Sequence, residues 1–221
     1  MKFDFRQLTS HFQLYGNFVV AVPYGTGHIN DTFQVTFDQG GTLLHYIIQR
    51  VNTNVFKAPE ELMDNFLRVT RHIGAKIRDE RAADPATRRR TLEVVNSIYG
   101  KPYWRDPAGN FFRCYVFVEN ARSYDILETK AQAYQAAAAF GNFQADLADL
   151  PQRLNETIPD FHNTPSRLAN LEKAAKEDKL GRLKSVSREF DFIMARGKEC
   201  GVLIDLQKEG ELVERVTHND T

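Results

Sequence analysis

The 221 residues are 42% apolar and 26% charged, and 29 basic side chains balance 29 acidic ones, so the formal net charge is zero. This composition allows a core of ordinary size and excludes a protein that binds nucleic acid or a membrane through its bulk charge. Cys114 and Cys200 form no C-x-x-C pair, which argues against a disulfide framework or a zinc site. No run approaches about 18 apolar residues, and the first residues do not resemble a signal peptide, so we expect a cytoplasmic protein.

The first half of the chain has the pattern of a sheet that is interrupted by one helix. Asp4 is suited to cap a short helix, and a turn is expected at 38–41. Apolar runs and alternation predict strands at 18–24, 31–37, 42–51, 92–99 and 111–118. Pro59 is suited to open a helix that ends near Asp84 and Pro85.

The second half is mainly helical in pattern. Helices are predicted at 124–150, 165–179 and 181–207, followed by a strand at 211–217. This separation of strands from helices predicts an α+β fold with two lobes. We place the boundary so that residues 1–120 form a nucleotide-binding lobe and residues 121–221 the first part of a helical lobe.

The segment between the first two predicted strands has the composition of a phosphate-binding hairpin. It runs from Gly25 to Thr32, and its glycines let backbone N–H groups approach an anionic ligand closely. It is not a Walker loop, because the Gly-Lys-Ser/Thr ending is missing and a strand follows. The candidate nucleotide-binding residues are Gly25, Thr26, Gly27, His28, Asn30 and Thr32.

Arg50, near the end of the third predicted strand, is the candidate cation for the phosphates. Kinase-like folds place a cation on that strand, where it also pairs with an acidic residue of the next helix. The sequence does not choose among Glu60, Glu61 and Asp64 as the partner. Neighbouring strand residues face opposite sides of a sheet, so the assignment fails if Gln49 faces the nucleotide in place of Arg50.

Two further segments follow in chain order. Phe117, Val118 and Glu119 lie where the last strand of the first half enters the helical half. In a two-lobed kinase this connection offers backbone groups to the adenine ring, although a simple linker between domains fits the residue types equally well. His218-Asn-Asp220 has the form of the His-x-Asp that opens a kinase catalytic loop, which makes Asp220 the candidate catalytic base.

Four blocks of the sequence carry a resemblance to one family. They are Tyr24-Gly-Thr-Gly-His-Ile-Asn-Asp-Thr-Phe33, Ile48-Gln-Arg-Val-Asn-Thr-Asn-Val-Phe-Lys57, Pro159-Asp-Phe-His-Asn-Thr164 with Arg167, and His218-Asn-Asp-Thr221. These blocks resemble the N-acetylhexosamine 1-kinase group of the aminoglycoside phosphotransferase and choline kinase superfamily. The resemblance extends over essentially the whole chain.

The resemblance implies a protein-kinase-like fold with two lobes and the transfer of a phosphoryl group from ATP, with Mg²⁺, to the anomeric hydroxyl of an N-acetylated hexosamine. It implies that residues 25–32 cover the phosphates, that Arg50 holds them and that Asp220 is the base. The metal ligands of this fold are expected beyond Thr221, so no metal-binding residue is assigned within the chain.

The same resemblance leads us to expect that the 221 residues are catalytically inactive and that they self-associate through apolar surface of a truncated second lobe. No nucleic-acid or membrane partner is expected. Two alternatives stay open. One is a kinase of another small alcohol, such as homoserine, choline or an aminoglycoside, and the other is a non-catalytic nucleotide-binding fragment.

Overall fold

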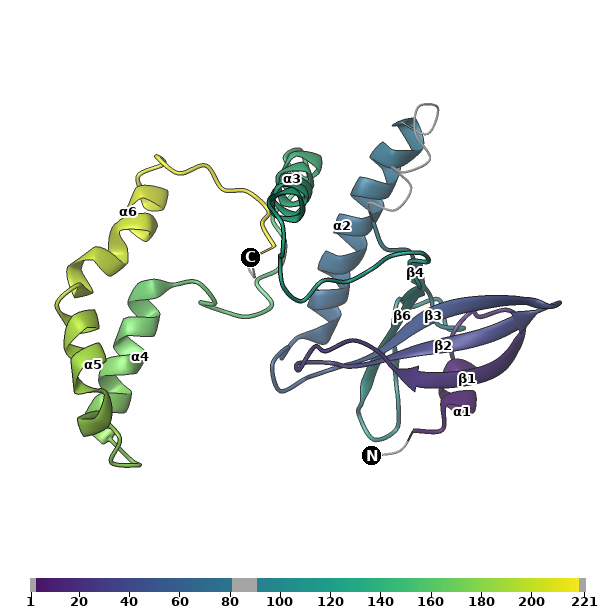
Figure 1. Cartoon of the computed structure of the whole chain (residues 1–221), viewed down its shortest axis with the longest axis horizontal. Coiled ribbons are helices and arrows are strands. Elements are labelled where there is room, and N and C mark those ends of the chain that lie inside the picture. Colours follow the sequence, from purple (N-terminus) through teal and green to yellow (C-terminus); the bar gives the residue numbers. More distant parts are fainter. Residues whose placement is uncertain (1–2, 81–90, 219–221) are drawn as a thin grey trace. The chain divides into compact units, whose positions relative to one another are not determined.

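An antiparallel sheet in the first half of the chain is followed by helices, which confirms the α+β class (Figure 1). The computed structural model describes residues 3–80 and 91–218. The chain divides into two units, Met1–Ile158 with the sheet (unit 1) and Pro159–Thr221 with helices (unit 2). The lobe boundary predicted at residue 120 stays a prediction, because a division into units does not test it.

The sheet has the strand order β1-β2-β3-β6-β4, with β5 also paired to β6, and all its pairs are antiparallel. Its strands are β1 (Asn17–Pro23), β2 (Asp31–Gln39), β3 (Thr42–Val51), β4 (Val94–Val95), β5 (Trp104–Arg105) and β6 (Phe111–Val116). The strand predicted at 92–99 is wrong in length. Only two residues pair with β6, because the chain turns after Ser97, whose N–H donates to the Lys101 carbonyl at 2.7 Å.

Helices cover the two faces of the sheet. On the α1 face, Val35, Ile48 and Phe112 are buried together with residues of the segment that contains α1 (Phe5–Thr9). Asp4 caps α1 as predicted, since its carboxylate accepts a hydrogen bond from the Gln7 N–H at 3.1 Å. The burial of large apolar side chains is the main stabilising contribution on this face.

On the opposite face, here called the α2 face, α2 (Pro59–Glu80) packs against β3 and β6. Met63 is buried with Val51 and Phe111. Helix α2 begins at Pro59 as predicted, because a proline has no N–H to leave unpaired at the first helical position. The predicted end of this helix near residues 84–85 lies outside the described residues.

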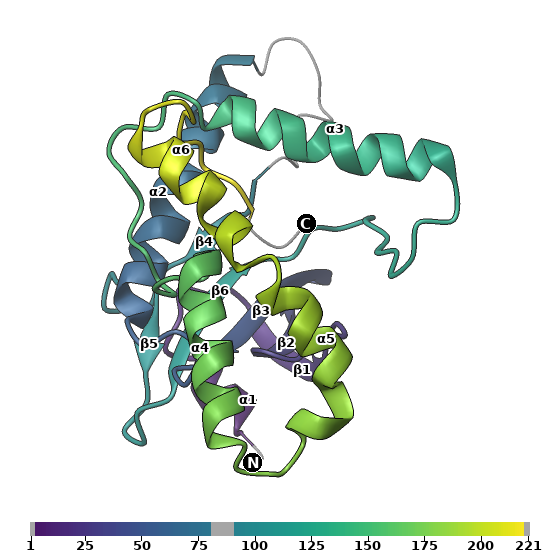
Figure 2. The same ribbon diagram turned by 90° about the vertical axis from the view of Figure 1, so that its left-hand side faces the viewer.

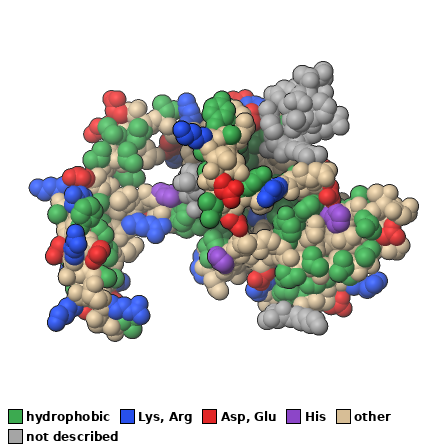
Figure 3. Space-filling model, in the orientation of Figure 1, with side chains coloured by type: hydrophobic (Ala, Val, Ile, Leu, Met, Phe, Trp, Pro, Cys, Tyr) green, Lys and Arg blue, Asp and Glu red, His purple; other side chains and the backbone are tan. Residues whose placement is uncertain are grey.

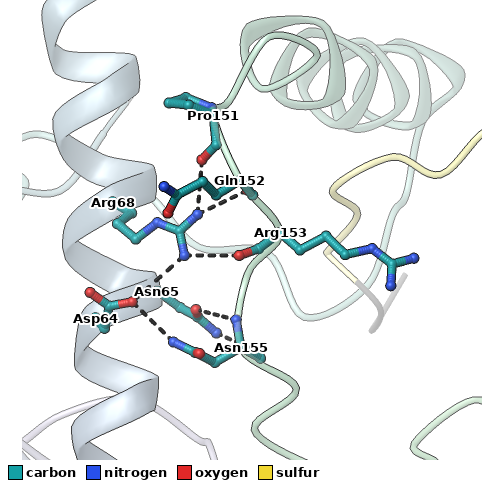
Figure 4. Close-up of polar contacts among 7 residues, drawn as sticks. All are labelled: Asp64, Asn65, Arg68, Pro151, Gln152, Arg153 and Asn155. Carbon is teal, nitrogen blue, oxygen red and sulfur yellow. Dashed lines mark hydrogen bonds and ion pairs between the residues drawn. The ribbon is translucent and has the colours of Figure 1, made fainter.

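The segment after α3 (Lys130–Asp146) is tied to α2 by hydrogen bonds (Figure 4). Arg68 donates to the three carbonyls of residues 151–153 at 2.9 to 3.0 Å. Asn65 and Asn155 exchange two further bonds, at 2.7 and 2.8 Å. The segment therefore gains its attachment to α2 mainly through backbone groups.

The helix predicted at 124–150 is shorter in the structure, because a capping box sets its start. The Thr129 hydroxyl accepts from the Gln132 N–H, while the Gln132 side chain accepts from the Thr129 N–H. This arrangement satisfies two of the free N–H groups of a helix terminus at one point of the chain. Residues 124–129 consequently lie outside the helix.

Unit 2 contains α4 (Thr164–Glu177), η2 (Leu183–Val186), α5 (Ser187–Met194), η3 (Gly197–Gly201) and α6 (Val202–Lys208). The chain reverses after α4 and returns beside it (Figures 1 and 2). The helical pattern predicted at 181–207 is confirmed, but it forms several short helices, because the glycine-bounded 3-10 helix Gly197–Gly201 separates α5 from α6. The strand predicted at 211–217 is wrong. These residues form no regular structure, and no strand of unit 2 is present among the described residues to pair with them.

Unit 2 exposes apolar side chains among its charged ones (Figure 3). Leu180, Phe192 and Leu203 are exposed, and no side chain in its described part is fully buried. The expected self-association is untested and stays a prediction. No helix among residues 3–80 and 91–218 is both long and apolar enough to cross a bilayer.

Candidate functional site

The glycine hairpin, residues 24–32, joins β1 to β2 and is closed at its base. The Tyr24 N–H donates to the Thr32 carbonyl at 2.9 Å, and Gly25 has a φ of +81° that favours glycine. A Cβ at Gly25 or Gly27 would meet nothing within 4 Å. Since residues 25–29 are exposed, the hairpin presents open backbone with room for an anionic ligand.

The part of this hairpin that leads into β2 is anchored to the segment that follows β3. Asn30 accepts a hydrogen bond from the Asn52 N–H at 2.9 Å through its side-chain oxygen. Asn30 was expected to contact nucleotide, and the structure assigns its oxygen to this backbone contact. Thr26 and His28 lie in the exposed part of the hairpin, and their contact with a nucleotide stays a prediction.

Arg50 lies on the α1 face, which corrects the expectation that it pairs with an acidic residue of the following helix. Its Nε donates to Asp31 at 2.6 Å, and its guanidinium carbon lies 5.7 Å from the centre of the Phe3 ring. Glu60 pairs instead with Arg105. The reason is strand parity, because Arg50 shares a face with Ile48 while α2 packs on the other side.

Gln49, on the α2 face, links the glycine hairpin to a second arginine. Its side-chain N–H donates to the Thr32 hydroxyl at 2.8 Å. Its carbonyl accepts from Nε and Nη2 of Arg113 at 2.9 and 2.7 Å. The three residues are direct neighbours on β2, β3 and β6, so the chain of hydrogen bonds crosses the sheet.

Arg113 was not predicted as a site residue. It is half-buried, and its guanidinium carbon lies 4.7 Å from the centre of the Phe66 ring on α2. Burial lowers the pKa of the Arg113 guanidinium, and the neighbouring Tyr115 hydroxyl opposes this shift. The only sequence signal was one basic residue inside the apolar strand Phe111–Val116, a pattern that charged residues rarely show without a ligand or a partner.

The connection at residues 117–119 meets the base of the glycine hairpin. The rings of Tyr24 and Phe117 contact edge-to-face, with their centres 5.3 Å apart. The Phe117 N–H donates to the His45 carbonyl at 3.1 Å, and the His45 ring binds the Glu119 carboxylate at 2.5 Å. Val118, the residue between Phe117 and Glu119, is half-buried. Two predicted site segments more than 80 residues apart are thus brought together.

Exposed apolar side chains lie beside this contact. Val20 and Val22 of β1 are 45% and 41% exposed, and they pair with Thr36 and Gln34. Cross-strand partners share a face, so both valines project from the same side of the sheet as Gln49. The α2 face therefore carries an uncovered apolar strip that continues to Tyr24 and can receive a flat aromatic ring.

Asp220, the candidate base, lies outside the described residues, and its role stays a prediction. In the described part of the chain, no group of three or more His, Cys, Asp or Glu side chains is placed to hold a metal ion. The described residues thus offer no cluster that fits the expected Mg²⁺. Two surface cavities of unit 1, of about 350 and 550 Å³, are lined by residues other than the hairpin and Arg113.

No protein-family model matches the chain.

Proposed function

We propose that this chain carries the nucleotide-binding part of an ATP-dependent small-molecule kinase with a two-lobed, protein-kinase-like fold. The observation that supports this best is the contact between the glycine hairpin and the 117–119 connection through Tyr24 and Phe117. In kinases a glycine-rich hairpin covers the phosphates of the nucleotide. The contact puts such a hairpin next to the segment expected to meet the adenine.

In this proposal the α2 face of the sheet binds the nucleotide. Adenine packs on the exposed strip of Val20, Val22 and Tyr24, because a planar ring gains most from apolar and aromatic contact. Backbone N–H groups of residues 25–29 donate to the phosphates. Magnesium, when bound, would neutralise phosphate charge, and no step is assigned to it because the described residues do not form its site.

The acceptor in this proposal is the anomeric hydroxyl of an N-acetylated hexosamine, as the sequence resemblance implies. Because the 221 residues alone are expected to be inactive, incubation of a longer chain that contains them, with γ-labelled ATP and one of four acceptors, tests this part. They are N-acetylglucosamine, N-acetylgalactosamine, homoserine and choline. Label in a sugar 1-phosphate supports the proposal, whereas label in choline or homoserine assigns another acceptor. ATP binding without any transfer would indicate a nucleotide-binding module.

Nucleotide binding by the α2 face has its own test. We expect Tyr24→Ala to weaken ATP binding about tenfold in isothermal titration, since one aromatic contact to a base contributes about 1–3 kcal/mol. Phe117→Ala should also weaken it, because the Phe117 ring packs against Tyr24. Tyr134→Ala is the matched control, because Tyr134 is 70% exposed on α3. Equal ATP affinity in all three variants and the parent chain would refute a nucleotide site at this contact.

A further inference from the structure

Arg113 holds a positive charge against the α2 face of the sheet without an acidic partner. Among residues 3–80 and 91–218, no carboxylate lies within ion-pair distance of its guanidinium. Asp31, Glu60 and Asp64, which belong to β2 and α2, each pair with another arginine. A desolvated charge is costly unless it is paired, so an uncompensated arginine at this place indicates an anionic ligand.

The hydrogen bonds of Arg113 leave donors unused. Nε and Nη2 both donate to the one carbonyl oxygen of Gln49, and no hydrogen bond of Nη1 is present within the described part of the chain. The Phe66 ring stabilises a cation through its face but does not neutralise it. The guanidinium is therefore held in place while part of its binding capacity is free.

Gln49 connects this guanidinium to the glycine hairpin. Its amide donates to the hydroxyl of Thr32, the last residue of the hairpin, while its carbonyl fixes Arg113. Directly opposed side chains on neighbouring strands lie about 5 Å apart, so Thr32 and Arg113, on either side of Gln49, lie about 10 Å apart. A ligand with several linked phosphate groups can thus contact the hairpin N–H groups and Arg113 at once.

We propose that Arg113 binds the phosphate groups of the nucleotide and that Gln49 positions its guanidinium. This inference rests on the proposed function and moves the phosphate-binding role away from Arg50, whose charge Asp31 already compensates. Arginine forms paired, charge-assisted hydrogen bonds with phosphate oxygens, which suits an unpaired guanidinium at the end of a chain of hydrogen bonds.

The test compares ATP, adenosine and inorganic tripolyphosphate by isothermal titration of the 221-residue chain. Gln49→Glu keeps the side-chain volume but sets a carboxylate against Arg113. We expect it to weaken ATP and tripolyphosphate binding at least tenfold and to leave adenosine binding unchanged. Arg113→Gln should have the same effect. A purely structural Arg113 would predict higher thermal stability in Gln49→Glu with no loss of affinity.

Two controls separate charge from position. Arg50→Gln removes the arginine of the α1 face, and Gln39→Glu adds the same charge as Gln49→Glu at an exposed position on β2. Both should bind all three ligands as the parent chain does. Circular dichroism and thermal unfolding check each fold. If Arg113→Gln does not fold, the ligand affinities of Gln49→Glu decide whether Arg113 binds phosphate, because this variant adds an ion pair and removes no side-chain volume.

The outcomes distinguish this inference from the proposed function. Unchanged ATP and tripolyphosphate affinity in folded Gln49→Glu, or a loss in Arg50→Gln alone, overturns the role of Arg113 and leaves nucleotide binding standing. Tripolyphosphate binding that depends on Arg113, without binding of ATP or adenosine, supports the anion site and contradicts the kinase proposal. A chain that binds none of the three contradicts both.

Discussion

Gly16, the residue before β1, offers a sharp test of how β1 is held against the hairpin of β2 and β3. Its φ is +100°, and an added Cβ would lie 2.4 Å from the Asp38 carbonyl oxygen and 3.3 Å from the Gln39 Cα. These are backbone atoms of the paired strand, so they cannot move aside as a flexible side chain would. Gly16→Ala therefore has to displace the start of β1 or the turn.

The expected loss follows from two contributions. A left-handed conformation costs a residue with a Cβ about 1–2 kcal/mol, and overpacking adds about 1–3 kcal/mol. Their sum, about 2–5 kcal/mol, is a large share of a typical free energy of unfolding of about 5–15 kcal/mol. Gly27→Ala is the matched control, because its Cβ would meet nothing within 4 Å, and it should change stability by less than about 0.5 kcal/mol.

Urea unfolding followed by tryptophan fluorescence measures both variants. Trp104 is the only tryptophan of the chain, and its ring stacks on His11 with the ring centres 4.0 Å apart, so its emission reports on unit 1. A loss of less than about 1 kcal/mol in Gly16→Ala, or equal losses in the two variants, would refute the close approach as the reason for this glycine.

Two further predictions concern titratable groups. Hydrogen bonds from Lys76 and His72 lower the pKa of Asp149 to about 2, so its contribution to stability is present above pH 4 and is lost as the pH falls toward 2. Asp149→Asn should therefore have a lower Tm than the parent chain at pH 6, and the difference should shrink as the pH falls to 2; a difference at pH 2 as large as that at pH 6 would contradict this sign. Burial raises the pKa of the Cys114 thiol, so a thiol reagent should modify only the half-buried Cys200 in the native chain and none in Cys200→Ser. Equal modification of both cysteines before unfolding would disprove the protection.

The hairpin strands could be predicted from the sequence because their signals are local. The alternation of residues 31–37 and the turn at 38–41 depend only on neighbouring residues, as does the proline that opens α2. The strand at 211–217 failed for the opposite reason. A strand exists only if another strand lies beside it, and the sequence of one segment does not supply that partner.

The site was harder to predict than the fold because it depends on which face of the sheet α2 covers. Alternation shows that Gln49 and Arg50 point to opposite sides, but the path of residues 52–58 decides which side meets the helix. The sequence therefore favoured Arg50, whose residue type suits phosphate, over Gln49. Arg113 belongs to no sequence motif, because its contact with Gln49 arises only when β3 and β6 pair.

The attachment of the segment at 151–153 to α2 has a consequence for sequence drift. Arg68 binds carbonyl oxygens there, and every amino acid supplies a carbonyl. Substitutions at 151–153 that keep the backbone path thus leave all acceptors in place, whereas a single change at Arg68 removes all three bonds together. Residues 151–153 should therefore tolerate substitution, whereas Arg68 on α2 should not.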